Sequence, residues 1–281
     1  MRLMSLAILL VALPACPSKT DAPAPARLEL LQQVEVTDRS RPDDRVPGVD
    51  ADAVAGWVTA RLRASKAITL VSKPGPGVYR LGVELGVGKR DGKPVLLVSA
   101  RAEVPGDLER VILQASLVRT PDSVDAAQMR KAVETAVEDI LFQAKLAVAG
   151  EREVVQALER PRDVQRLAAA VEIVAVRQVK AAVPPLIKLL RHKDASIADR
   201  AIGALAAIGD QRAVRPLTRL TKFYNTEKMA KVIDAIATLG GQEAKDYLEF
   251  VASGHDDADI RNLASEALQR MRRKGQAKQS K

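Results

Sequence analysis

The sequence predicts an α+β domain followed by an all-α solenoid, and two repeating patterns support this prediction. Between residues 79 and 117, apolar and polar side chains alternate with period two in three successive segments, which is typical of β-strands with one solvent-facing side. Between residues 150 and 273, apolar positions recur every 31 residues, which indicates stacked helix pairs that bury their apolar faces against one another. The length of 281 residues is sufficient for two such domains.

The composition favours closely packed helices and argues against a nucleic-acid-binding protein. Hydrophobic residues make up 47% of the chain but aromatic residues only 2%, so Ala, Val, Leu and Ile must build the cores. The net charge is +9, but residues 270–281 contain six cations and no acid: Arg270, Arg272, Arg273, Lys274, Lys278 and Lys281. Because so much of the charge lies in one tail, we expect no nucleic-acid partner. We interpret residues 274–281 as a basic disordered tail.

The N-terminus has the pattern of a secretory signal peptide. Arg2 precedes an apolar run over residues 3–13 that is too short to span a bilayer. The sequence LPAC at residues 13–16 then resembles the lipobox of bacterial lipoprotein signal peptides. This resemblance implies that residues 1–15 are removed and that Cys16 becomes a lipidated N-terminus, which several acyl chains would anchor stably. The alternative is an ordinary cleaved signal peptide with an incidental cysteine nearby.

The residues around the cysteine bear on where the protein would be found. Cys16 is the only cysteine, so it cannot form an internal disulfide. Pro17 follows it in place of Asp, which in lipoproteins with this motif favours the outer membrane. Residues 16–26 are rich in Pro and Ala and would form a flexible tether. The resemblance therefore implies a lipid-anchored protein of the bacterial cell envelope that faces the periplasm.

Residues 27–149 are expected to form the α+β domain, with elements in the order β-α-β-β-β-β-α. Asp50 and Asp52 can cap the first helix, and the Asp91-Gly92 pair is a strong hairpin signal between two strands. The last helix carries an apolar stripe from Met129 onward. The expected strands cover residues 28–36, 67–72, 79–87, 96–104 and 111–117, and the first helix runs to about residue 65. We therefore predict an antiparallel sheet with both helices on one face.

Residues 150–273 repeat a helix A, a turn and a helix B. A polar residue able to cap helix A recurs every 31 residues, at Asp163, Asp194, Asn225 and Asp256. Buried positions are expected along three more ladders: Val155, Leu186, Leu217 and Leu248; Leu158, Leu189, Leu220 and Val251; and Val174, Leu205, Ile236 and Ala267. Gly209 and Gly240 follow two A helices, as a left-handed C-terminal residue prefers. The B helices are expected over residues 179–191, 210–222 and 241–253.

Two motifs of the central repeats resemble a known family. AVPPLIKLL at residues 182–190 and RAIGALAAIGD at residues 200–210 resemble HEAT repeats, specifically the short HEAT-like type shared with phycobilisome bilin lyases. The resemblance implies an all-α HEAT-like solenoid in which the B helices line the concave face, where partners usually bind. Residues 151–160 keep the period, so we interpret them as an unpaired B helix that joins the two domains rigidly.

No pattern in the chain indicates catalysis, so we predict that the protein is not an enzyme. His192 and His255 are the only histidines, and they fall at turns two repeats apart without a His-Glu pair. Because a metal site needs convergent ligands, we predict no metal and no cofactor. Both histidines are interpreted as solvated turn residues.

The B helices carry a candidate partner-binding surface. Cations recur at the 31-residue spacing in two rows, one with Arg160, Arg191 and Lys222 and the other with Lys188 and Arg219. Such a stack of cations would attract an acidic protein partner. The alternative is a solvated face whose long side chains cover the apolar rows beneath them.

The sequence thus predicts a non-catalytic envelope lipoprotein that acts as a protein-protein interaction module through its solenoid. One alternative is an enzyme or lyase-accessory protein that binds a small ligand in the solenoid groove. Another is a structural protein that contacts peptidoglycan or anionic lipid through the basic tail. A deep groove with convergent polar groups would favour the ligand-binding alternative, and a shallow charged face would favour protein binding.

Overall fold

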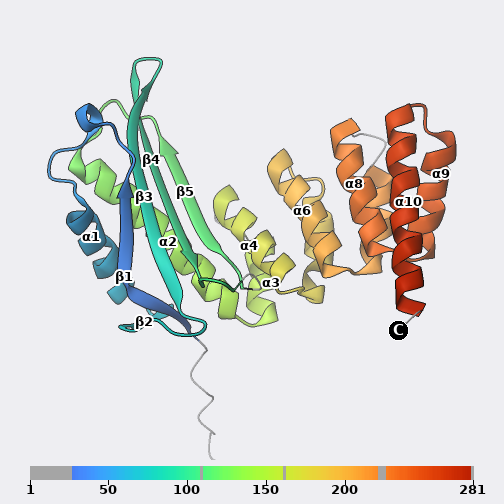
Figure 1. The fold of residues 1–281 in the computed structure, drawn as a ribbon, viewed down its shortest axis with the longest axis horizontal. Helices are drawn as coiled ribbons and strands as arrows, with labels where there is room; N and C mark the ends of the chain where they lie inside the picture. The colour runs from blue at the N-terminus through green and yellow to red at the C-terminus, as the bar shows by residue number, and fades with distance from the viewer. Residues whose placement is uncertain (1–26, 108–109, 161–162, 221–225, 280–281) are drawn as a thin grey trace, which may run out of the picture.

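The computed structural model describes residues 27–107, 110–160, 163–220 and 226–279. A five-stranded sheet with two helices forms one end of the molecule, and a row of helices extends from it to the C-terminus (Figure 1). No helix within the described ranges is long and apolar enough to cross a membrane. The predicted signal peptide, Cys16 and the tether lie outside the described residues.

The α+β domain has the predicted order of elements. They are β1 (Leu28–Asp38), α1 (Ala51–Arg63), β2 (Ile68–Val71), β3 (Tyr79–Arg90), β4 (Lys93–Glu103), β5 (Leu113–Arg119) and α2 (Ala126–Val148), with a 3₁₀ turn at Pro42–Asp44. The Asp50 carboxylate caps α1 by accepting a hydrogen bond from the Ala53 N–H at 2.8 Å, whereas Asp52 lies within the first turn. Asp91 and Gly92 both have positive φ, which is the hairpin geometry that this pair favours.

The sheet is mixed, whereas we predicted an antiparallel one. The strand order is β2-β1-β3-β4-β5, and β3, β4 and β5 pair antiparallel as expected. The strand β1 instead pairs in parallel with both β2 and β3. The reason is that α1 carries the chain back across the sheet before β2 begins, as in any β-α-β crossover. Period-two alternation marks strands but not their direction.

One face of the sheet is covered and the other is open. The inward-facing residues of β3 and β4 are nearly inaccessible, including Leu81, Val83, Leu96 and Val98. Helices α1 and α2 contact each other and pack on the same side, as Figure 1 shows. The predicted stripe of α2 is buried there except for Val148, which lies at the end of the helix and is 37% exposed.

The repeats follow the predicted ladder closely. Their elements are α3 (Glu151–Glu159), α4 (Val164–Val176), α5 (Val183–Leu189), α6 (Ala195–Ile208), α7 (Val214–Leu220), α8 (Thr226–Leu239), α9 (Gln242–Gly254) and α10 (Ala258–Gln279), with 3₁₀ turns at Lys180–Ala182 and Gln211–Ala213. We use the term A layer for α2, α4, α6, α8 and α10, and B layer for α3, α5, α7 and α9. One ladder, Val174, Leu205, Ile236 and Ala267, is 0% exposed in every repeat.

The predicted caps hold in the first two repeats and shift in the last. Asp163 accepts a hydrogen bond from the Arg166 N–H at 2.7 Å, and Asp194 accepts one from Ser196 at 2.9 Å. In the last repeat Asp257, not the predicted Asp256, caps α10 by accepting from the Asp259 N–H at 2.8 Å. The turn before α10 is therefore one residue longer. Asn225 lies outside the described residues.

The C-terminal ends of α6 and α8 agree with the prediction, whereas those of α4 and α10 differ from it. Gly209 and Gly240 take the left-handed conformation with φ of 71° and 69°, as predicted. The A helix α4 ends without a glycine, and Gln178 adopts φ of 50° in its place. At the C-terminus α10 continues to Gln279, so our prediction of a disordered tail from residue 274 is wrong for residues 274–279. The tail is rich in Lys, Arg, Gln and Ala, which are good helix formers.

The helix α2 belongs to both domains. Its residues Ile140 and Ala144 pack into the core under the sheet, whereas Leu146 and Ala149 pack into the core of the repeats. The helix also contacts α4, which in turn contacts α6. The Arg177 guanidinium donates a hydrogen bond to the Leu146 carbonyl at 2.9 Å across this junction. Thus α2 serves as the A helix of the first repeat, with α3 as its B helix.

Candidate functional site: the B layer surface

Charged residues of the A layer form ion pairs across each of its helix interfaces. Each pair of neighbouring A helices is joined by one ion pair: Asp139 with Arg166 at 2.9 Å, Glu172 with Arg200, Asp199 with Lys231 at 2.8 Å, and Asp234 with Arg270 at 2.7 Å. These bonds affect titration as well. The Lys231 ammonium group donates hydrogen bonds to Asp199 and to Glu227, and these bonds raise its pKa above the usual value, Asp199 having the larger effect. At its helix interfaces the A layer therefore uses these charges to join one repeat to the next.

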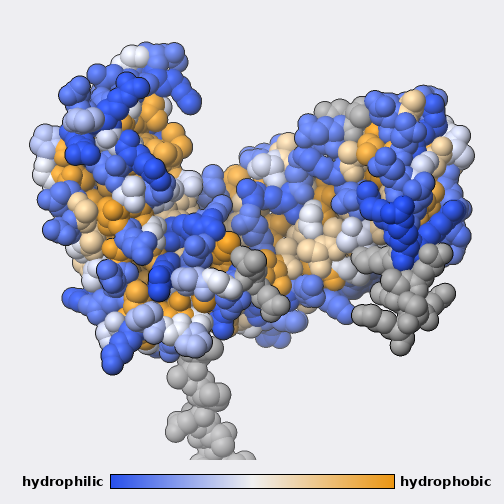
Figure 2. Space-filling view, in the orientation of Figure 1, coloured by the Kyte–Doolittle hydropathy of each residue, from blue (hydrophilic) through white to orange (hydrophobic). Residues whose placement is uncertain are grey.

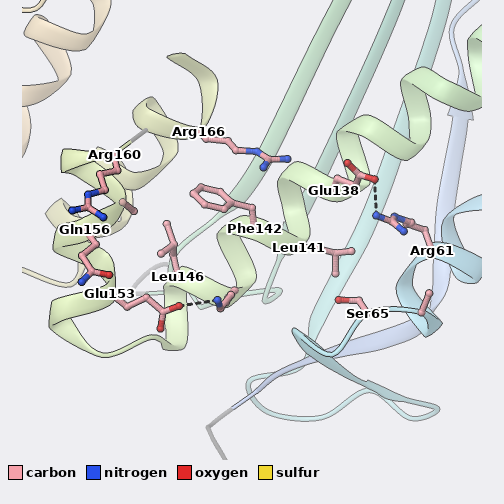
Figure 3. Close-up of a pocket in the computed structure, with 13 residues that line it drawn as sticks. Arg61, Ser65, Glu138, Leu141, Phe142, Leu146, Glu153, Gln156, Arg160 and Arg166 are labelled. Carbon is pink, nitrogen blue, oxygen red and sulfur yellow. Dashed lines mark hydrogen bonds and ion pairs between the residues drawn. The ribbon is translucent and has the colours of Figure 1, made fainter. Parts of the chain in front are cut away.

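The most buried of these pairs lies at the junction between the domains. The Arg166 side chain is only 16% exposed and that of Asp139 only 18%. The Arg166 guanidinium also lies 5.2 Å from the centre of the Phe142 ring, a cation–π arrangement that Figure 3 shows. Because α2 supplies Asp139 and Phe142, this cluster ties α4 to α2 and so to the α+β domain.

The cations of the B layer differ from those of the A layer in their ion pairing. Of the five cations that the sequence placed in rows, Arg160, Lys188, Arg191 and Arg219 are exposed, and Lys222 lies outside the described residues. Within the described part of the chain, none of these four forms an ion pair, and no ion pair joins one B helix to another. Arg160, Lys188, Arg191 and Arg219 thus form an exposed positive surface without ion-pair partners among the described residues.

The register of the B helices explains why these cations fall in line. Leu186, Leu217 and Leu248 are each 0% exposed and occupy the same position in α5, α7 and α9. Two residues later come Lys188, Arg219 and Phe250, so these three side chains occupy equivalent positions on consecutive B helices. Phe250 is 72% exposed, the highest value among the large hydrophobic residues of the described chain.

Phe250 is the functional candidate that sequence reasoning missed. The 31-residue ladder from Lys188 through Arg219 leads directly to it, but an apolar residue on a helix suggests a core position. The exposed acids Asp246 and Glu249 of α9 interrupt the basic surface. Glu249 lies 3.7 Å from Lys245 of the same helix. The B layer surface therefore changes from basic on α5 and α7 to acidic and aromatic on α9.

A cleft adjoins the first repeat where α1, α2, α3 and α4 meet. It has a volume of about 560 Å³, and Figure 3 shows Phe142, Leu141 and Leu146 on its α2 wall and Arg160 and Gln156 on its α3 wall. Its other charges are paired with each other, Arg61 with Glu138 at 2.6 Å and Lys145 with Glu153 at 2.8 Å. The polar groups of the cleft bond to one another across its walls and do not converge on a common point.

The two histidines have a structural part in the turns. The Nδ1 atom of His192 accepts a hydrogen bond from the Asp194 N–H, and that of His255 accepts one from the Asp257 N–H, both at 3.1 Å. Each histidine is half-buried and lies just before a capping aspartate, so the prediction of solvated turn residues needs this correction. In the described part of the chain, no three His, Cys, Asp or Glu side chains lie close enough together to hold a metal ion.

The start of the B helix α7 also has a local charge cluster. Arg212 donates hydrogen bonds to the Asp210 carboxylate at 2.7 and 2.9 Å, and these bonds hold the pKa of Asp210 at about 2. Arg212 also reaches the Lys180 carbonyl of the preceding repeat at 3.3 Å. This arginine is used to fix one repeat against the next, unlike the free cations of the two rows.

Comparisons with known proteins support the helical repeats. Residues 151–225 match the family model of HEAT repeats. The HEAT-like repeats predicted from the two central motifs are therefore confirmed in this part of the chain. No curated protein matches the chain.

Two solved structures of engineered proteins show partial similarity. One, Northeast Structural Genomics Consortium target OR497, has a TM-score of 0.36 and 18% identity, covering 50% of this chain and 44% of its own. Another, target OR329, has a TM-score of 0.36 and 19% identity, covering 52% of this chain and 74% of its own. This chain thus spans less than half of the first structure.

The charged and apolar regions are distributed unevenly over the surface. Figure 2 shows a broad notch between the sheet and the helical repeats, with hydrophilic residues over the outer ends of both parts. Apolar residues appear in patches on the wall of the sheet domain and between the repeats. With an α+β domain fused through α2 to HEAT-like repeats, the molecule presents an extended surface suited to contact with another macromolecule.

Proposed function

We propose that this protein is a non-catalytic interaction module whose B layer surface binds a protein partner of acidic character. The observation that carries the proposal is the contrast in charge pairing. Every A helix interface contains an ion pair, whereas Arg160, Lys188, Arg191 and Arg219 have none among the described residues. A row of exposed cations without counter-charges attracts an acidic surface and accelerates encounter with it.

A ligand-binding function is less well supported by the shape of the molecule. The cleft of about 560 Å³ next to the first repeat is the best candidate for such a site. Its acids are already paired with its bases, and Arg160, which has no ion pair among the described residues, lies on the α3 side of the cleft (Figure 3). A small ligand would have to break these ion pairs, whereas an acidic protein surface would add to Arg160 without breaking any.

We further propose that the protein acts at the bacterial cell envelope, held by a lipid on Cys16 at the outer membrane and facing the periplasm. The support is the LPAC sequence at residues 13–16 and the apolar run before it. A Cys16→Ser variant should then leave the membrane fraction and appear in the soluble fraction of the periplasm. Membrane association that persists in this variant would contradict the lipid anchor.

The partner-binding proposal is tested by reversing charge. The variant Lys188→Glu/Arg191→Glu/Arg219→Glu should lose capture of acidic partners from envelope extracts, whereas the parent retains them. A matched control, Arg63→Glu/Lys73→Glu/Lys89→Glu, changes the net charge equally at exposed cations of the α+β domain. Equal loss in both triple variants would mean that only total charge matters, and equal retention would remove the B layer surface as the binding site.

A further inference from the structure

We infer that the B layer surface binds an extended acidic peptide segment that places one bulky apolar side chain against Phe250. This inference rests on the proposed function and adds the form and direction of the partner. It starts from the equivalence of Lys188, Arg219 and Phe250, which the fully buried residues Leu186, Leu217 and Leu248 fix in one register. The three exposed side chains therefore form a line that crosses three consecutive B helices.

The exposed side chain of Phe250 favours an apolar contact with the partner. Its side chain is 72% exposed on α9, while the neighbouring residues Leu248 and Val251 are buried in the core. An aromatic side chain gains roughly 1.5–3 kcal/mol when it is fully buried, so a partner that covers Phe250 gains affinity from a single contact. No other large apolar side chain of the described B helices is exposed to this degree.

The charges around Phe250 set the direction of the partner. Asp246 and Glu249 are exposed on α9 and repel the acidic part of a ligand. On and just after α5 and on α7, the same surface carries Lys188, Arg191 and Arg219, to which no acid of the described residues is paired. The acidic residues of a bound segment must therefore lie over α5 and α7, and its apolar residue must lie over α9.

The spacing between helices sets the spacing of the partner's residues. Neighbouring packed helices lie roughly 8–10 Å apart, so the line from Lys188 to Phe250 spans about 20 Å. An extended chain advances about 3.3 Å per residue, which gives about three residues per repeat. The matching segment is acid-x-x-acid-x-x-apolar, with the acids opposite Lys188 and Arg219 and the apolar residue opposite Phe250.

A segment of protein fits this arrangement better than a membrane surface. Anionic lipid head groups would contact all exposed residues of the face at once, including Asp246 and Glu249, which would repel them. A single chain can contact one residue on each helix and leave the acids of α9 in water. A line of two cations followed by one aromatic side chain thus fits a linear partner.

The test uses a fluorescein-labelled heptapeptide with Glu at positions 1 and 4, Leu at position 7 and Gly or Ser elsewhere, with the reversed sequence alongside. Binding to the full protein is measured by fluorescence anisotropy at low salt. Phe250→Ala should weaken binding of the better of these two peptides by about tenfold, whereas it should not change binding of the peptide with Ser in place of Leu. Arg219→Glu should weaken binding of the peptide with Leu and of the peptide with Ser in place of Leu. Val118→Ala, which alters an exposed valine on the sheet, is the matched control and should change the binding of neither peptide.

The outcomes separate this inference from the proposed function. If Arg219→Glu weakens binding but Phe250→Ala does not, the acidic partner stands and the apolar contact is wrong. If neither peptide binds while capture from extracts still depends on Lys188, Arg191 and Arg219, the extended segment is wrong and the proposed function stands. If phosphatidylglycerol vesicles bind in a way that Phe250→Ala abolishes and neither peptide binds, the surface recognises lipid and the inference is overturned.

Discussion

The A layer and the B layer of the repeats are built from similar helices but use charge in opposite ways. Every interface between A helices contains an acid and a base in contact, from Asp139 with Arg166 to Asp234 with Arg270. Within the described residues, the cations on the exposed rows of the B helices have no such partners. The difference indicates that charge in the A layer fixes one repeat against the next, whereas charge in the B layer remains available for contacts outside the molecule.

The largest expected effect on stability comes from the junction pair of the A layer. Arg166→Ala leaves Asp139 with little access to water and no cation, and it removes the contact with Phe142. Breaking an ion pair of this kind costs about 3 kcal/mol. The free energy of unfolding, measured by urea denaturation with far-UV circular dichroism, should fall by that amount.

The matched control for this prediction is an exposed pair of the same layer. Arg200 and Glu172 are 44% and 43% exposed, so Arg200→Ala should lower the free energy of unfolding by at most about 1 kcal/mol. Equal losses in the two variants would show that the burial of the Arg166 pair contributes nothing beyond an ordinary surface contact.

The link from α8 to α9 is the next most sensitive position between the two layers. Gly241 has φ of 88° and ψ of 172°, a conformation that is almost restricted to glycine, and an added Cβ would lie 2.9 Å from the Gln211 side chain. Gly241→Ala should therefore lower the free energy of unfolding by about 1–3 kcal/mol. Gly203, inside α6 with open space around it, is the control, because Ala there should stabilise by up to about 1 kcal/mol. A neutral or stabilising effect at Gly241 would contradict the assigned link geometry.

A smaller effect of opposite sign is expected after α4. Gln178 holds φ of 50° at the place where Gly209 and Gly240 hold the left-handed conformation in later repeats. Gln178→Gly should raise the free energy of unfolding by about 0.5–1 kcal/mol, and Gly209→Ala should lower it by a similar amount. Thermal denaturation of both variants against the parent measures the two shifts. If both variants lose stability, the backbone conformation at Gln178 is not strained.

Local patterns in the sequence predicted much of this fold because they depend on neighbouring residues. Period-two alternation located β3, β4 and β5, and the 31-residue ladders located the buried faces of the repeats down to Leu217 and Leu248. The parallel pairing of β1 was not predictable in this way, since strand direction depends on the path of α1 across the sheet. The shift of the last cap to Asp257 required only one extra turn residue, which a strict period cannot show.

The candidate site was predicted in part for the same reason. The ladder placed Arg160, Lys188, Arg191 and Arg219 on one side, and the structure shows all four exposed. Their lack of ion-pair partners could not be predicted, because it depends on which acids the neighbouring helices bring near. The double role of α2 and the exposure of Phe250 were missed because both depend on tertiary packing and not on periodicity.

The smallest expected effect is on the salt dependence of stability, and the sign of that effect tests the contrast between the A layer and the B layer. Lys188→Ala/Arg219→Ala should change the free energy of unfolding by no more than about 0.5 kcal/mol, because these side chains form no ion pair with any residue that the structure describes. Added salt screens repulsion between like charges and attraction between opposite ones. Raising sodium chloride from about 0.05 M to about 0.5 M should therefore stabilise the parent slightly more than this double variant, and slightly less than the Arg200→Ala variant. Urea denaturation at the two salt concentrations measures both differences, and the same sign in both would mean that the A layer and B layer do not differ in their use of charge.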